Sequence, residues 1–179
     1  MDEDTRKEFS AIIQKNTEEL MQLVNDVLDL SRLEANMMKF QIQEYDAVAL
    51  CNDAIYMARM RNEETIEIYF DTHIETQPIT TDTGRLIQAL VSTLTYPQKN
   101  TTHREITFTL TRDDSGKQIC FRISNSPLAD PEFNSQEVSI RHDINRLLLQ
   151  HFGGSYNITA DEQERPVINF TYPLDIISE

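Results

Sequence analysis

The sequence predicts an α+β fold: a two-layer α/β sandwich, with one mixed sheet and helices on one of its faces, preceded by a long N-terminal helix. Three observations support this prediction. Apolar residues recur in steps of four and three through the N-terminal segment, strand-like and helix-like segments alternate after "NMMKF", and clusters of turn-forming residues separate them. A chain of 179 residues is long enough to bury a core in one domain and to add a separate helix.

Residues 1–38 are predicted to form a single bundle or coiled-coil helix, from Thr5 to Ala35. Ile12, Val24 and Leu28 widen its apolar stripe, which favours a bundle of more than two helices. Because the seam has no partner within the chain, we expect the protein to form a homodimer through this helix. Its one polar member either fixes the register or is simply tolerated. The seam consists of Phe9, Ile13, Asn16, Leu20, Leu23, Val27 and Leu30.

Residues 39–179 are predicted to form the second domain, which begins with a strand at 39–43 ("KFQIQ"). Asp46 is a good N-cap, and it places a helix from Ala47 to Arg61. Two further strands follow, at 66–70 ("IEIYF") and 78–82 ("PITTD").

The second half of this domain continues the alternation of helices and hairpins. A helix from Thr83 to Thr95 precedes a hairpin at 104–124, whose turn is supplied by "DDSG". A last long helix from Ser139 to Phe152 stops at two glycines. Strands at 155–160 and 167–174 form the closing hairpin.

The composition argues against two classes of partner. Sixteen Lys and Arg residues against thirty Asp and Glu residues give a net charge of −14, which repels a phosphate backbone, so we expect no direct contact with nucleic acid. No apolar run approaches the ~20 residues that a bilayer requires, so we expect a cytoplasmic protein that meets a membrane only through an upstream region. Cys51 and Cys120 lie far apart in apolar surroundings, which predicts buried free thiols.

The chain contains no pattern that supports catalysis or metal binding by itself. Its four histidines lie at no i, i+4 spacing and near no cysteine pair, which argues against a zinc site. No G-x-S-x-G motif accompanies its serines. Its four glycines are too scattered to form a glycine-rich phosphate loop. The residues alone therefore predict no catalytic residue and no metal site.

Several segments nevertheless resemble the sensor histidine kinases of two-component systems. The second helix of that family's dimerisation and phosphotransfer domain resembles "IIQKNTEELMQLVNDVLDLSRLEANMMKF". Its N box, D-x-x-R-L-x-Q-x-L-x-N-L-L-x-N-A-x-K-F-T, is similar to "DTGRLIQALVSTLTYPQKNT". The end of its GHKL-type ATP-binding domain resembles "INRLLLQHFGGSYNI" and "VINFTYPL". The resemblance covers nearly the whole chain and implies the fold of that family, which uses ATP and magnesium.

The same resemblance implies that the nucleotide site has decayed. The family's two N-box asparagines fall on Ser92 and Tyr96, and the second of them normally helps to hold the magnesium ion. Tyrosine supplies no amide oxygen for that purpose. Pro97 stands at the family's alanine, and a proline inside a helix costs about 3 kcal/mol, so we expect this helix to end early. Lys99 still matches the N box.

Two glycine motifs of the family have changed as well. Its D-x-G-x-G box aligns on "NSPLA", where Asn125 could still accept a hydrogen bond from adenine, while Pro127 and Ala129 replace the glycines. The G-x-G that cradles phosphates at the start of the last helix aligns on Ser139 and Arg141. We therefore expect no bound cofactor.

The family's lid and phosphoacceptor also differ here. Only residues 130–138 stand in place of the long lid. None of the four histidines has the neighbours of the family's H-E-x-R-T-P-like motif, so we expect the phosphoacceptor to lie upstream of this chain.

These inferences predict a degenerate histidine-kinase module, a cytoplasmic part of a two-component sensor that acts by dimerisation and by contact with a response regulator or receiver domain. Two alternatives stay open. One is an active ATP-dependent histidine kinase whose phosphoacceptor histidine lies upstream. The other is an α+β interaction domain, unrelated to kinases, that binds another protein through its acidic surface.

Overall fold

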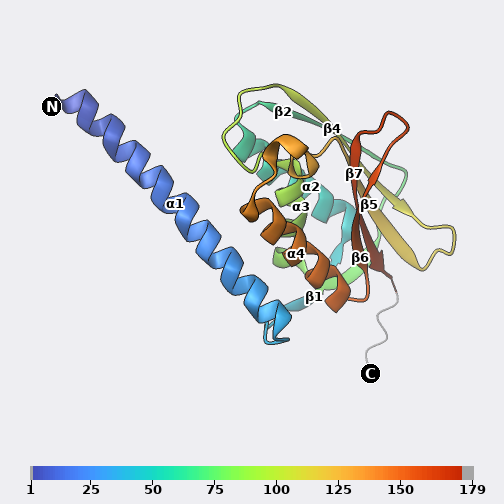
Figure 1. Cartoon of the computed structure of the whole chain (residues 1–179). Helices are drawn as coiled ribbons and strands as arrows, with labels where there is room; N and C mark the ends of the chain where they lie inside the picture. The colour runs from blue at the N-terminus through green and yellow to red at the C-terminus, as the bar shows by residue number, and fades with distance from the viewer. Residues whose placement is uncertain (1, 175–179) are drawn as a thin grey trace. The chain divides into compact units, whose positions relative to one another are not determined.

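Two compact units, Met1–Met38 and Lys39–Glu179, make up the chain in a computed structural model that describes residues 2–174. The first unit is a single helix and the second is an α+β domain (Figure 1). Within the described residues, none of the helices combines the length and the apolar character needed to cross a bilayer.

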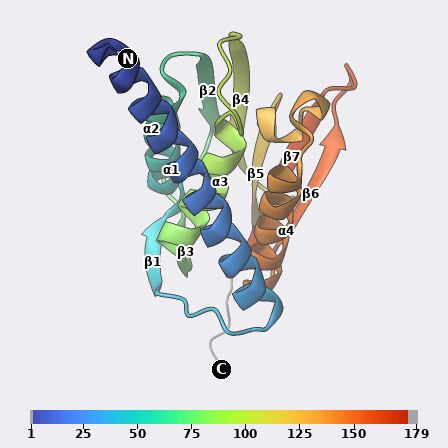
Figure 2. The same ribbon diagram turned by 60° about the vertical axis from the view of Figure 1, so that its left-hand side comes forward.

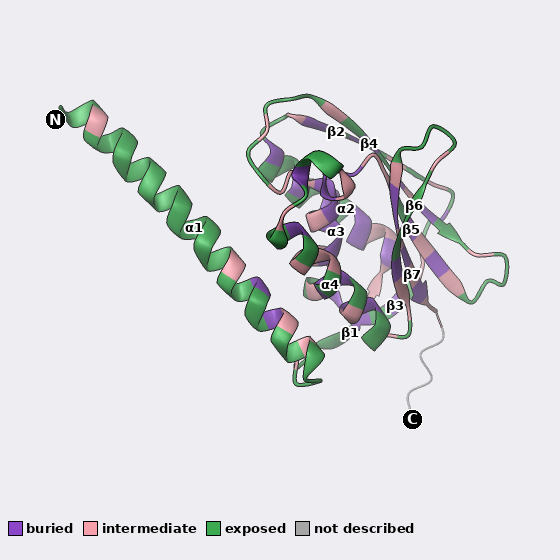
Figure 3. Cartoon of the chain, viewed as in Figure 1, coloured by how far each residue is buried: buried purple, intermediate pink, exposed green. Residues whose placement is uncertain are grey.

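The helix α1 spans Glu3–Glu34, within two residues of the predicted ends. Asp2 caps it, because the Asp2 carboxylate accepts a hydrogen bond from the Thr5 backbone N–H at 2.7 Å. Most of its residues are exposed (Figure 3). Large apolar side chains are among them, as expected of a surface that meets another helix. The large exposed ones are Phe9, Ile12, Ile13, Leu20, Met21, Val24, Val27 and Leu28.

Five strands of the second unit form one mixed sheet in the order β2-β4-β5-β7-β6. β2 runs parallel to β4 and the other pairs are antiparallel, which confirms the predicted mixed sheet. The strands are β2 (Ile66–Thr72), β4 (Arg104–Arg112), β5 (Gln118–Ser124), β6 (Ser155–Ala160) and β7 (Pro166–Pro173).

Two of the predicted strands lie outside this sheet. β1 (Ile42–Asp46) pairs with β3 (Pro78–Asp82) as a separate antiparallel ribbon. The predicted strand at 39–43 was placed three residues too early, because the apolar alternation already begins at Phe40. That ring instead stacks on His151, with 4.3 Å between ring centroids, so side-chain packing rather than a strand ladder holds this part of the chain.

Three helices cover one face of the five-stranded sheet (Figures 1 and 2). Asp46 and Asp82 cap the first two of them by accepting hydrogen bonds from backbone N–H groups of the first turn. The helices are α2 (Ala47–Asn62), α3 (Thr83–Leu94) and α4 (Gln136–His151).

The last helix starts one turn earlier than predicted. α4 begins at Gln136 rather than at Ser139, because the Ser135 hydroxyl accepts a hydrogen bond from the Val138 backbone N–H and caps the helix there. Two short 3-10 helices precede it, η1 (Pro127–Ala129) and η2 (Pro131–Phe133).

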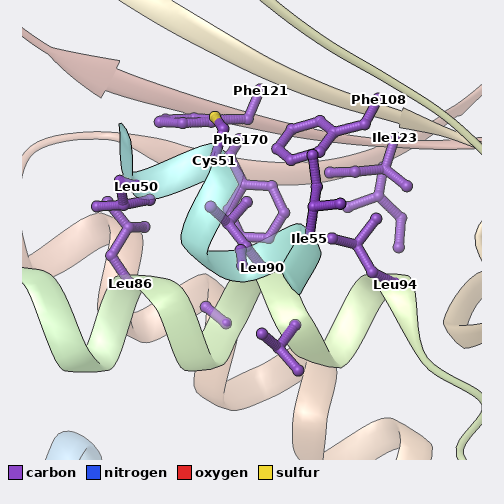
Figure 4. Close-up of a cluster of buried hydrophobic side chains, with 14 of the residues drawn as sticks. Leu50, Cys51, Ile55, Leu86, Leu90, Leu94, Phe108, Phe121, Ile123 and Phe170 are labelled. Atoms are coloured by element: carbon purple, nitrogen blue, oxygen red, sulfur yellow. The ribbon is translucent and has the colours of Figure 1, made fainter. Parts of the chain in front are cut away.

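The hydrophobic core lies between these helices and the sheet (Figure 4). Leu50 of α2 and Leu90 of α3 face Phe108 and Phe121 of the sheet, and all four side chains are fully buried. Burying a side chain of this kind contributes roughly 1.5–3 kcal/mol. The domain is therefore held together by its own side chains.

The opposite face of the sheet is polar, because residues that alternate with the core positions point away from the helices. Thr109, Arg122 and Asn169 lie side by side on it in neighbouring strands. Cys120 belongs to this face and is only half-buried, so the prediction of a buried thiol was wrong for Cys120. It holds for Cys51, which lies in the core, and both thiols are free.

Gly154, which follows α4, provides a test of this packing. A Cβ atom there would lie 2.1 Å from the Thr171 carbonyl oxygen, so the backbone would have to shift. We expect Gly154→Ala to lower the free energy of unfolding, measured by urea denaturation, by about 1–3 kcal/mol or more. In the control Gly84→Ala, a Cβ atom meets Asp82 Oδ1 at an ordinary 3.7 Å. Helix propensity then predicts a gain of up to about 1 kcal/mol. Equal stability of the two variants would contradict this account.

Candidate functional site

The candidate site lies where α3 ends beside α4. α3 ends at Leu94, and Thr95 is already extended, with φ −125° and ψ 154°. A proline disfavours helical conformation in the residue before it, so the helix cannot run on through Tyr96 into Pro97. The helix thus ends before Tyr96, as the sequence predicted.

The Tyr96 side chain turns back onto the protein. Its hydroxyl donates a hydrogen bond to the Thr102 carbonyl oxygen, which closes the loop after α3. Its ring lies 5.6 Å from the Phe133 ring, centroid to centroid, and the Arg104 guanidinium carbon lies 5.9 Å from its centroid. Tyr96 therefore connects the end of α3 with η2 and with the first residue of β4.

Arg104 contacts two residues of the segment that follows β5. Its guanidinium donates to the Asn125 backbone carbonyl at 3.2 Å and to Asn125 Oδ1 at 3.3 Å, and it forms an ion pair with Asp130. Asn125 also donates from Nδ2 to the Glu105 carbonyl at 2.9 Å. Both ends of the Asn125 amide are thus engaged within the protein.

The environment of Asp130 keeps its carboxyl group ionised. Removal from water, the largest single influence, raises the pKa of this group. The Glu132 backbone N–H and the Arg104 guanidinium lower it and together prevail, so the pKa of Asp130 lies below its usual value. Side-chain exposures of 15% for Arg104 and 17% for Asp130 place the ion pair largely out of water.

The segment between β5 and α4 packs into the hydrophobic core. Leu128, Phe133 and Val138 are buried and belong to the core cluster. Ser126 fixes the start of the segment, because its hydroxyl donates to the Thr93 carbonyl of α3 at 2.6 Å and accepts from the Leu128 N–H at 3.2 Å.

Four polar side chains meet beneath this segment. Asn145 of α4 is fully buried and donates from Nδ2 to Ser92 Oγ of α3 at 3.2 Å. Its Oδ1 has no hydrogen-bond partner among residues 2–174. His142 Nε2 lies 3.1 Å from the Leu128 carbonyl oxygen, and His142 Nδ1 lies 2.6 Å from the Tyr156 hydroxyl oxygen. Since a carbonyl only accepts, Nε2 carries the proton and Nδ1 accepts from Tyr156.

Burial favours the neutral forms of two of these groups. Removal from water lowers the pKa of His142 and raises the pKa of Tyr156. A neutral imidazole matches the donor and acceptor roles that His142 takes between Leu128 and Tyr156.

Comparisons with known proteins identify the fold. No protein-family model matches the chain. Over 72 residues, or 40% of this chain, it is 36% identical to the uncharacterized sensor-like histidine kinase ycf26 of Pyropia yezoensis. The Acinetobacter baumannii histidine kinase AdeS superposes with a TM-score of 0.70 at 14% identity, over 98% of this chain and 86% of that one. Histidine kinase ThkA, in complex with response regulator protein TrrA, gives a TM-score of 0.69 at 16% identity, over 98% and 53%.

The chain is related to the sensor histidine kinases. It spans between 5% and 14% of the length of the curated histidine kinases that it matches. The second unit has the fold of a histidine-kinase catalytic domain, and the long N-terminal helix is part of the same likeness.

On this histidine-kinase fold, some of the predicted nucleotide-site positions come together. Tyr96 and Asn125 both contact Arg104, and Ser92 contacts α4 through Asn145. Pro127 is buried in η1 and the neighbouring Ala129 is half-buried.

The remaining predicted positions lie apart from these contacts. Lys99 is exposed in the loop between α3 and β4. Ser139 and Arg141 were predicted at the start of the last helix, but α4 already begins at Gln136 and places both inside its first turns, Ser139 exposed and Arg141 half-buried. A helical backbone there pairs its N–H groups within the helix instead of offering them to a phosphate.

Three residues of the site were not predicted from the sequence: Arg104, Phe133 and Asn145. A signal existed for Asn145, because it is a polar residue among the apolar positions Ile144, Leu148 and Leu149 of the last helix. No local pattern marks Arg104, whose hydrogen-bonding partners Asn125 and Asp130 lie after the next strand.

The Arg104–Asp130 pair can be tested by its pH dependence. A lowered pKa in the folded state contributes stability above the unfolded pKa of about 4, and that contribution is lost as the pH falls through the folded value. We therefore expect Asp130→Asn to lower the free energy of unfolding by about 1–2 kcal/mol at pH 7, and by progressively less below about pH 4.

The control for this measurement is Asp143→Asn, which removes an exposed ion pair with Arg146. Exposed pairs contribute at most about 1 kcal/mol. A pH-independent difference between Asp130→Asn and the parent chain, in urea denaturation from pH 3 to pH 7, would contradict the assigned charge state.

Proposed function

We propose that the chain is a signalling module of a two-component sensor whose nucleotide site is filled by its own side chains, so that it acts through dimerisation and protein contacts rather than through phosphoryl transfer. The observation that carries this proposal is the burial of Leu128 and Phe133. Leu128 lies within the segment that aligns with the family's adenine-binding box, and Phe133 lies where the family has its lid.

The polar groups of the aligned box support the proposal because they are already paired. The Leu128 N–H donates to Ser126 Oγ, and the N–H groups of Ala129 and Asp130 donate to the carbonyls of Ser126 and Pro127. The Asn125 amide is held by Arg104 and by the Glu105 carbonyl. A nucleotide would have to break several of these bonds, and each buried group left unpaired costs about 1–3 kcal/mol.

The N-box position also favours a site without a metal. Magnesium is bound by carboxylate, carbonyl and phosphate oxygens. At the position of the family's magnesium-binding asparagine, the Tyr96 hydroxyl donates to the Thr102 carbonyl and its ring packs on Phe133. We infer that no magnesium–nucleotide complex occupies this region.

The partners that fit such a module are a second copy of the chain and a receiver domain. The exposed apolar side chains of α1 support the first, since such a surface is unfavourable in water. ThkA was solved with response regulator protein TrrA, and by that likeness we propose the receiver domain of a response regulator as the second.

The alternative function is an active histidine kinase whose phosphoacceptor lies upstream. It is favoured by the fold of the second unit, which is that of a histidine-kinase catalytic domain. Within this fold, α3 and α4 are joined by the Asn145–Ser92 hydrogen bond. For ATP to bind, η1 and η2 would have to leave the core and the Arg104–Asp130 pair would have to open.

Nucleotide binding separates these two functions. A ligand at 100 times its Kd stabilises a protein by about 2.7 kcal/mol, which raises Tm by several degrees for a chain of this size. We expect 1 mM Mg-ATP, about 100 times a Kd of 10 μM, to leave Tm unchanged. The double variant Ser92→Asn with Tyr96→Asn restores both N-box asparagines and should also stay silent in calorimetry, because Leu128 and Phe133 are still in place. A saturable shift in the parent chain, or a Kd below about 100 μM in the variant, would favour the active kinase.

Self-association tests the proposed dimer. Leu23→Asp places a charge on the apolar seam of α1, so we expect it to shift the dimer towards monomer by at least ten-fold in Kd, or about 1.4 kcal/mol, in light scattering and sedimentation. Asn25→Asp adds the same charge to the same helix off the seam, at an exposed position, and should leave the dimer intact. A parent chain that is monomeric at high micromolar concentration would exclude this dimer.

A further inference from the structure

Three side chains that can bind a metal ion meet on β2 and β4, outside the nucleotide region. Glu67 of β2 and Glu105 of β4 are direct neighbours in the parallel ladder, and His103 precedes β4 by one residue. One ligand atom of each of the three lies within 4.8 Å of the others, and His103 Nε2 lies 3.9 Å from a carboxylate oxygen of Glu67. All three residues are exposed, so an ion from solution can reach them.

We propose that Glu67, His103 and Glu105 form a binding site for a divalent transition-metal ion of the zinc type. The donor set consists of one imidazole nitrogen and two carboxylate oxygens, which zinc accepts readily, whereas magnesium and calcium prefer oxygen ligands alone. Three protein ligands leave at least one coordination position for water or for a group from another molecule.

The strand pairing supplies the geometry that such a site needs. Because Glu67 and Glu105 are paired in register in neighbouring strands, their backbones hold the two carboxylates side by side. In a tetrahedral site with bonds of about 2.0–2.2 Å, neighbouring ligand atoms lie roughly 3.3–3.5 Å apart. Small rotations of exposed side chains are enough to close the observed separations to that value.

The charges around Glu67, His103 and Glu105 also favour a bound cation. Two carboxylates directly opposite each other on neighbouring strands repel, and the chain carries a net charge of −14. The Tyr69 hydroxyl donates to Glu67 Oε2 at 2.7 Å and orients that carboxylate.

A bound ion would connect the edge strand β2 to β4, its neighbour in the sheet that the structure describes. The sequence predicted no metal site, because Glu67 is far from His103 along the chain and only the parallel pairing brings them together. The proposed metal site does not depend on whether the chain binds a nucleotide, since none of its three ligands is among the residues that align with the ATP-binding motifs.

The experiment uses the untagged full chain, freed of metal with a chelator and then dialysed. We expect zinc chloride to bind at one ion per chain in isothermal titration calorimetry and to raise Tm, while magnesium chloride at the same concentration does neither. His103→Ala and Glu105→Gln should each weaken zinc binding at least ten-fold. His73→Ala removes another exposed histidine and should bind as the parent chain does.

The quantity to compare is the change in Tm that zinc causes in each variant. Without zinc, Glu105→Gln relieves the carboxylate repulsion, so its Tm should equal or exceed that of the parent, which separates loss of a ligand from loss of the fold. Zinc affinity unchanged in both His103→Ala and Glu105→Gln, an equal response to magnesium, or no saturable zinc binding by the parent chain would each overturn the proposal.

Discussion

The contacts of the Arg104 guanidinium are the constraint on which the candidate site depends. Arg104 is the first residue of β4, so its position is fixed by the central sheet. From there it bonds the Asn125 carbonyl, pairs with Asp130 and lies over the Tyr96 ring. The end of α3 and the segment after β5 are thus both held by contacts with the first residue of β4. Opening either of them would expose the Arg104–Asp130 ion pair, which is now largely out of water. The sheet therefore favours the closed arrangement, because it fixes the position of Arg104.

The residues of the segment after β5 also favour the closed backbone. Asn125 adopts a left-handed conformation with φ 63°, which asparagine tolerates better than most residues. Ser126 then caps η1 with Pro127 in its first turn, and Asp130 caps η2 in the same way with Pro131. A proline has its φ already set and lacks the N–H that would need a partner at a helix start. The segment "NSPLADP" therefore specifies its own two short helices, and Leu128 and Phe133 reach the core as a result.

Local signals predicted most of the fold, and long-range contacts account for what they missed. The caps Asp46 and Asp82 act within a few residues, so the starts of α2 and α3 were predicted correctly. The start of β1 was not, because stacking on His151, more than a hundred positions away, decides where Phe40 lies. In the candidate site, the end of α3 before Tyr96 followed from a proline. The roles of Arg104 and Asn145 depend on partners in other elements and had to come from the structure.

The packing of the candidate site bears on how such a module could carry a signal. A ligand shifts a conformational equilibrium only by binding one state better than the other. Here the segment between β5 and α4 is bound to α3 through Ser126, to β4 through Asp130 and to the core through Phe133. A signal that acts on this segment therefore has to displace these contacts.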